Sequence, residues 1–159
     1  MRKGEIIFLA KFFLIFFSLY AVILFSDISA LTFYITGLEC SLLGLGNSGN
    51  MALINGGMFE ITNSCTGLVS AATLAGIVFA LRKPGLKTKA MVFIPGFALL
   101  MAVNLARLYV VLWSAVVFGT GFAEIVHVVS WLAMGGAVLA AWYFATKRIS
   151  KLDSWRGFI

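Results

Sequence analysis

Long apolar stretches alternate with short polar segments along the chain, and four of these stretches are near or above the length of a membrane span. They cover residues 6–25, 66–81, 90–118 and 124–145. A helix crosses a hydrocarbon core of roughly 30 Å with about 20 apolar residues. We therefore predict an all-α helical bundle of about four transmembrane helices, forming a single membrane domain over residues 1–159.

The longest connection, residues 26–65, has a pattern of its own. From Ile28 to Leu45 apolar residues recur at helical spacing, which predicts a helix lying on a membrane surface. A more polar set falls on another face of that helix: Thr32, Thr36, Glu39 and Cys40. Two short apolar-rich runs then surround Asn55-Gly56-Gly57, which predicts a β-hairpin just before the second span.

Composition supports the membrane class. Hydrophobic residues make up 62% of the chain and charged residues 11%, with a mean hydropathy of +1.04. So few charges cannot cover the surface of a soluble domain of this size. The net charge of +6 does not indicate nucleic-acid binding, because the cations flank apolar stretches and do not share one patch.

The placement of the cations predicts the orientation. Three groups of them lie before the first span, between the second and third spans, and after the fourth: Arg2 and Lys3; Arg82, Lys83, Lys87 and Lys89; Lys147, Arg148, Lys151 and Arg156. Residues 26–65 and 119–123 contain no Lys or Arg. The positive-inside rule then predicts a multi-pass cell-membrane protein with both termini cytoplasmic and residues 26–65 outside. We expect the first span to remain as an uncleaved anchor, because no convincing A-x-A cleavage site follows it.

One charged residue lies deep inside a predicted span. Arg107 is about 16 Å from the outer end of the third span, and an arginine at such a depth costs about 2.5–3.5 kcal/mol on insertion scales. Asn104, three residues earlier, shares its helix face. Arg107 either serves a functional site or pairs with a carboxylate to hold the bundle together.

Two further residues suit chemistry at the outer ends of the spans. Cys65 stands in "SCTG" (64–67), where the second apolar stretch begins. His127 is the only histidine, and Glu124 precedes it by three residues and could orient its ring. Taken alone, Cys65 could be a packing residue and His127 a solvated polar group. With Arg107 they supply a nucleophile, a base and a fixed cation from three different spans.

These residues, in this order, resemble the exosortase/archaeosortase family of membrane cysteine transpeptidases. The resemblance rests on "SCTG" at 64–67, "NLAR" at 104–107 and His127, and covers about residues 60–145. It implies that Cys65 is the nucleophile, His127 the acid/base and Arg107 the electrostatic stabiliser, with Asn104 and Thr66 in support. The chain is shorter than many family members.

The family also implies partners for this chain. A member cleaves secreted proteins at a C-terminal tripartite sorting signal, made of a short motif, an apolar span and a basic tail. It forms a thioester on its cysteine and transfers the product to a membrane lipid or another surface acceptor. The resemblance therefore places the active site at the outer face and calls for no cofactor.

Two other functions remain open on the sequence. Cys40 and Cys65 could be the redox pair of a four-span thiol–disulfide oxidoreductase, with or without a quinone, although the chain has no C-x-x-C motif and this function leaves Arg107 unexplained. A non-catalytic bundle, as an assembly or transport subunit, is the second. One His and two separated Cys make no recognised metal-ligand spacing, so no metal is expected.

Overall fold

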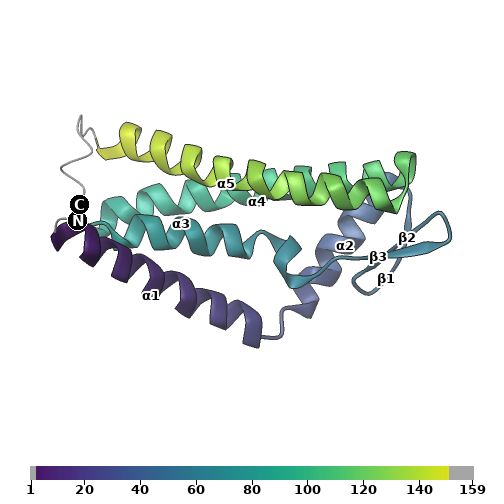
Figure 1. The fold of residues 1–159 in the computed structure, drawn as a ribbon, viewed down its shortest axis with the longest axis horizontal. Helices are drawn as coiled ribbons and strands as arrows, with labels where there is room; N and C mark the ends of the chain where they lie inside the picture. Colours follow the sequence, from purple (N-terminus) through teal and green to yellow (C-terminus); the bar gives the residue numbers. More distant parts are fainter. Residues whose placement is uncertain (1–2, 151–159) are drawn as a thin grey trace.

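The computed structural model describes residues 3–150, and helices dominate it. The helices α1 (Lys3–Phe25), α4 (Leu86–Phe118) and α5 (Thr120–Ser150) are long and apolar enough to cross a membrane. They run along the long axis of the molecule (Figure 1). These three helices confirm the prediction of a helical protein with membrane-spanning segments. Pro95 lies inside α4, and the helix continues through it.

The second predicted span, residues 66–81, is shorter in the structure than a membrane crossing requires. Helix α3 (Leu68–Ala80) occupies the expected position but has 13 residues. At a rise of 1.5 Å per residue it is about 20 Å long, against the roughly 30 Å of a hydrocarbon core. By length, the described residues therefore support three spans, and the number four is not confirmed.

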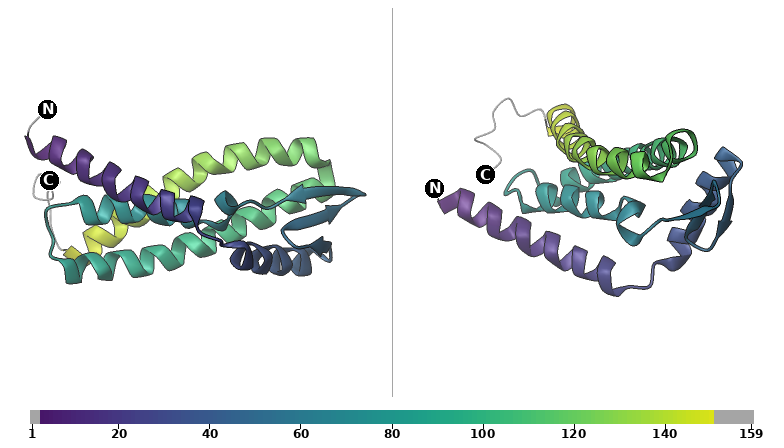
Figure 2. Two further views of the ribbon diagram at one scale, coloured as in Figure 1. Left: turned by 90° about the horizontal axis from the view of Figure 1, so that it is seen from below. Right: turned by 45° about the vertical axis from the view of Figure 1, so that its right-hand side comes forward.

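Close contacts at glycines hold α3 between its neighbours. A Cβ at Gly76 would lie 2.9 Å from the ring of Phe12 in α1, and a Cβ at Gly96 of α4 would lie 2.8 Å from Leu74. Small residues at these crossings let the helices approach closely. Helix α1 has no buried residue and lies along the outside of the bundle (Figure 2).

The outer connection begins with α2 (Ser29–Leu43), which ends at Gly44 in the left-handed conformation (φ 67°). The Leu45 amide donates to the Cys40 carbonyl at 2.8 Å, as in a Schellman cap. The buried face of α2 is largely the polar one: Thr32, Thr36, Glu39 and Cys40, together with Ile35. Leu31, Tyr34 and Leu42 are exposed. The predicted two-faced helix is confirmed, and its polar side faces the protein, which leaves apolar residues for a lipid surface.

A small antiparallel sheet follows in the order β1-β2-β3, made of β1 (Gly46–Ser48), β2 (Met51–Ile54) and β3 (Gly57–Glu60). The predicted hairpin is confirmed as β2–β3. Its turn places Asn55 and Gly56 at positive φ (50° and 82°), the conformation that Asn-Gly favours. Strand β1 was not predicted, because its residues are small and polar and lack the alternation of a half-buried strand.

The two ends of the molecule differ in charge. The start of α1, the α3–α4 connection and the end of α5 lie at one end, whereas α2 and the sheet lie at the other (Figure 1). The described cations that flank the helices therefore gather away from the sheet. Arg2, Lys151 and Arg156, which also entered the charge argument, lie outside the described residues.

Candidate active site

Cys65 lies in a short 3₁₀ helix, η1 (Asn63–Thr66), which joins the sheet to α3. The Cys65 amide donates to the Thr62 carbonyl at 2.9 Å. The Thr66 hydroxyl donates to the Asn63 carbonyl at 2.7 Å and accepts from the Leu68 amide at 3.4 Å. Thr66 therefore stabilises the turn that carries the cysteine, and its hydroxyl is bonded to the backbone.

Gly67 explains how this turn meets α4. Its φ is +84°, and a Cβ there would lie 2.8 Å from Cε of Met101 and 3.0 Å from Cγ of Asn104. A residue with a side chain would be strained at this φ and would also collide with α4. The Gly of "SCTG" thus allows the cysteine turn to dock directly on the third long apolar segment of the sequence.

Asn104 makes the bond that fixes this docking. Its Nδ2 donates to the Cys65 carbonyl oxygen at 2.7 Å, and both residues are about 1% exposed. A buried amide that is satisfied by a backbone carbonyl resists displacement, because the broken bond would leave polar groups unpaired. Asn104 therefore positions the backbone of Cys65 and does not face an open space.

Arg107 lies one turn further along α4 and is 9% exposed. Its guanidinium interacts with the Cys65 thiol, and its Cζ lies 5.4 Å from the centroid of the Trp131 ring. Nε and Nη2 are buried and have no hydrogen-bond partner within residues 3–150. No carboxylate pairs with Arg107 in this part of the chain. A fixed cation with unused donors thus lies beside the sulfur, an arrangement that suits a developing negative charge on a bound carbonyl oxygen.

His127 is half-buried near the start of α5. The centroid of its ring lies 6.5 Å from that of Phe59 and 6.4 Å from that of Trp131. The ring also interacts electrostatically with the guanidinium of Arg107. In the described part of the chain no hydrogen bond joins His127 to Cys65. Acid–base contacts are often long before substrate binds, so this geometry is compatible with proton transfer in a complex.

The structure therefore brings four of the six predicted site residues together, namely Cys65, Asn104, Arg107 and His127. Thr66 serves the turn. Glu124 is exposed, and among residues 3–150 no hydrogen bond links it to the histidine.

Two residues that the sequence analysis did not single out also contact the site. The Thr62 hydroxyl lies 3.6 Å from the Cys65 sulfur, and Trp131 covers the guanidinium of Arg107. The sequence spacing of each residue from a predicted site residue indicated that it could lie nearby. Trp131 follows His127 by four residues and shares its helix face. Thr62 precedes Cys65 by three residues, one turn of η1 away.

Cys40 has a different environment from Cys65. Both cysteines are free and belong to one buried cluster, in which Cys40 is 0% and Cys65 1% exposed. Burial and the neighbouring carboxyl of Glu39 raise the pKa of the Cys40 thiol. Burial also raises the pKa of Glu39 to about 7. A thiol with a raised pKa is a weak nucleophile at neutral pH. The neighbour of the Cys65 thiol is the guanidinium of Arg107 instead of a carboxyl.

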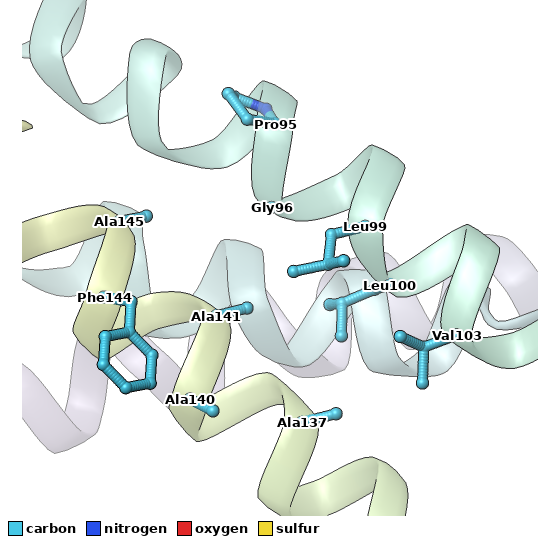
Figure 3. A pocket seen from close by; sticks show the side chains of 10 residues that line it. All are labelled: Pro95, Gly96, Leu99, Leu100, Val103, Ala137, Ala140, Ala141, Phe144 and Ala145. Carbon is cyan, nitrogen blue, oxygen red and sulfur yellow. The ribbon is translucent and has the colours of Figure 1, made fainter. Parts of the chain in front are cut away.

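Two cavities bracket the site. One, of about 410 Å³, lies between the end of α1 and the residues that precede Cys65. The other, of about 310 Å³, lies between α4 and α5 on the side of Arg107 away from the sheet. Its ten lining residues carry only hydrocarbon side chains or none, as Figure 3 shows. The second cavity offers no group for acid–base chemistry.

Within residues 3–150, no cluster of three His, Cys, Asp or Glu side chains suits a metal.

Comparisons with models of known protein families, with characterised proteins and with solved structures gave no match.

Proposed function

We propose that this protein is a membrane cysteine transpeptidase of the exosortase/archaeosortase type, which cleaves the C-terminal sorting signals of secreted proteins. The observation that carries the proposal is Arg107, a buried guanidinium beside the Cys65 thiol, whose Nε and Nη2 have no hydrogen-bond partner within residues 3–150. An unpaired buried charge is costly, and a bound substrate carbonyl would satisfy it. A purely structural arginine would be expected to have a carboxylate partner.

The chemistry follows from the positions of the side chains. The Cys65 sulfur attacks the carbonyl carbon of the scissile peptide bond, and Arg107 stabilises the negative charge on the carbonyl oxygen. His127 accepts the proton of the Cys65 thiol as the sulfur attacks and donates it to the leaving amine as the C–N bond breaks, which leaves a thioester on Cys65. A hydroxyl, amine or water then attacks the thioester, His127 accepts the proton of this nucleophile, and the same proton passes to the departing sulfur as the C–S bond breaks, which restores the thiol.

The membrane arrangement completes the proposal. The short helix α3 would act as a fourth apolar segment that ends below the outer surface, where η1 and the sheet take over. The cytoplasmic side would hold both termini and the α3–α4 connection, with Cys65 near the outer face. A sorting signal with its own membrane span would present its scissile bond at that depth. The acceptor in the proposal is a membrane lipid or another surface molecule.

The replacement Arg107→Lys tests the proposed mechanism. Lysine keeps the charge but loses the planar set of donors that can hold a carbonyl oxygen and a neighbouring group together. We expect processing of a co-expressed protein with a C-terminal sorting signal to fall about two to three orders of magnitude. Cys65→Ser and His127→Ala should block the same release, with all three variants accumulating normally in membranes. Full processing by Arg107→Lys would remove Arg107 from the catalytic set.

The thiol–disulfide oxidoreductase is less well supported. It needs Cys40 as a redox partner, and burial and the neighbouring carboxyl of Glu39 raise the pKa of the Cys40 thiol. The structure also gives this function no use for the unpaired donors of Arg107. Mass spectrometry under non-reducing conditions separates the two, because only the oxidoreductase requires a bond between the two cysteines during turnover.

A further inference from the structure

The 410 Å³ cavity at the end of α1 adjoins the turn that carries Cys65. Three consecutive residues before the cysteine line it, and so do Asn50 in the β1–β2 turn, Glu60 of β3 and the last turns of α1. Its polar lining residues are Tyr20, Asn50, Glu60, Thr62, Asn63 and Ser64. Because Cys65 itself is 1% exposed, a substrate needs a route to the sulfur, and this cavity lies next to it.

Thr62 links the cavity to the nucleophile. The Thr62 hydroxyl lies 3.6 Å from the Cys65 sulfur, and Thr62 also lines the cavity. Thr62 is exposed, and its hydroxyl lies 2.7 Å from that of Ser64. Rotation of the Thr62 side chain about χ1 exchanges this bond for one with a ligand or water and moves the hydroxyl away from the sulfur. An exposed side chain makes such rotations on a fast timescale.

The chemistry of the lining selects the ligand. The hydroxyls and amides of Thr62, Asn63 and Ser64 offer donors and acceptors along one stretch of chain. Glu60 is the charged residue of the lining, and it accepts a hydrogen bond from Asn50 at 3.2 Å. The lining contains no Lys or Arg, so it does not suit a phosphate or carboxylate ligand. A chain of peptide groups with a neutral or basic side chain satisfies both the hydrogen-bonding groups and the carboxylate.

We propose that this cavity is the subsite for the substrate polypeptide next to the scissile bond, that it takes an extended non-acidic peptide segment, and that Thr62 is its gate to Cys65. The proposal rests on the proposed function, because it assigns the cavity to the substrate of that reaction. Glu60 selects against acidic residues in the segment, and the three residues before the cysteine hydrogen-bond its peptide groups.

The rate at which Cys65 reacts with small charged thiol reagents tests the route. The full-length protein is treated with a cationic (trimethylammonium) and an anionic (sulfonate) ethyl methanethiosulfonate, and mass spectrometry locates the label. One charge at roughly 8 Å in water changes each rate about 2.4-fold in opposite directions, so Glu60→Gln should lower the cation-to-anion ratio about six-fold. Glu5→Gln is the matched control, because Glu5 lies 19 residues before the cavity end of α1, about 28 Å away.

Peptide protection tests the class of ligand. A capped Ala-Lys-Ala tripeptide should slow the labelling of Cys65, while capped Ala-Glu-Ala should protect much less and Glu60→Lys should reverse this order. Equal ratios in Glu60→Gln and Glu5→Gln, with Cys65 still labelled, would overturn the subsite and leave the proposed function intact. Protection by glycerophosphoethanolamine but not by either tripeptide would assign the cavity to a lipid headgroup and overturn the peptide subsite. A Glu60-dependent ratio together with normal processing by Cys65→Ser would instead refute the proposed function, and with it the assignment of the cavity to the substrate of that reaction, while the cavity would remain the route to Cys65.

Discussion

Replacement of Glu39 by glutamine should change how the stability of the protein depends on pH. Glu39 is 1% exposed on the inner face of α2, and its Oε2 has no hydrogen-bond partner within residues 3–150. Desolvation by burial raises its pKa to about 7 from the ordinary value of 4.5. The folded protein thus retains a proton that the unfolded chain releases between these two pH values.

The sign and size of the effect follow from this difference in pKa. A group with a raised pKa in the folded state contributes its full stability below pH 4.5 and loses that contribution as the pH rises through about 7. At about 1.4 kcal/mol per pKa unit, the wild-type protein loses roughly 3 kcal/mol over this interval. A glutamine at this position cannot ionise, so any cost of burying its amide is the same at every pH and the loss is absent from the variant.

Thermal unfolding in detergent, followed by tryptophan fluorescence from pH 4.5 to 8, measures the difference. The stability of Glu39→Gln relative to wild type should rise by roughly 3 kcal/mol across the range and level off above pH 7.5. Glu60→Gln, which removes an exposed carboxyl from β3, is the matched control and should follow the wild-type curve. Parallel curves for wild type and Glu39→Gln would show that the carboxyl is ionised and solvated in the folded protein, and would refute the reasoning.

Three further predictions concern the site and the topology. Gly67→Ala should abolish processing and destabilise the protein by at least about 1–2 kcal/mol, because alanine is strained at this φ and collides with α4. Normal activity and a normal melting temperature would contradict the docking of the turn. Cys40→Ala should retain activity, whereas its loss together with a 40–65 disulfide in the wild type would favour the redox function. A cysteine introduced at Ser48 should react with a membrane-impermeant label in intact cells and one at Lys87 should not, with the opposite pattern refuting the topology.

The sequence alone determined the helices and the turn that depend on residues close together along the chain. The apolar stretches predicted α1, α4 and α5 because length and hydropathy are properties of continuous segments. The turn at Asn55 and Gly56 was predictable because few residues adopt positive φ without strain. The two-faced pattern of α2 was readable because side chains three and four apart share a helix face.

The sequence did not predict features that depend on contacts between residues far apart along the chain. The direction of α2 is an example, since a pattern that separates polar from apolar faces does not say which face meets the protein. The start of α3 is another, because Gly67, at φ +84°, ends the turn that docks on α4, and the helix begins at Leu68 instead of at Thr66. Strand β1 is a third, because its residues carry no strand pattern and pair with β2 through backbone groups.

The candidate site divides in the same way. Residue types and span ends indicated Cys65, Arg107 and His127 as a set, since each is an unusual residue for its place in an apolar chain. Only the tertiary structure related them: the Asn104–Cys65 bond joins positions 39 residues apart, and the guanidinium reaches the sulfur from the next helix. The unpaired donors of Arg107 and the burial of Glu39 were likewise decided by packing, because whether a polar group finds a partner depends on what the folded chain brings beside it.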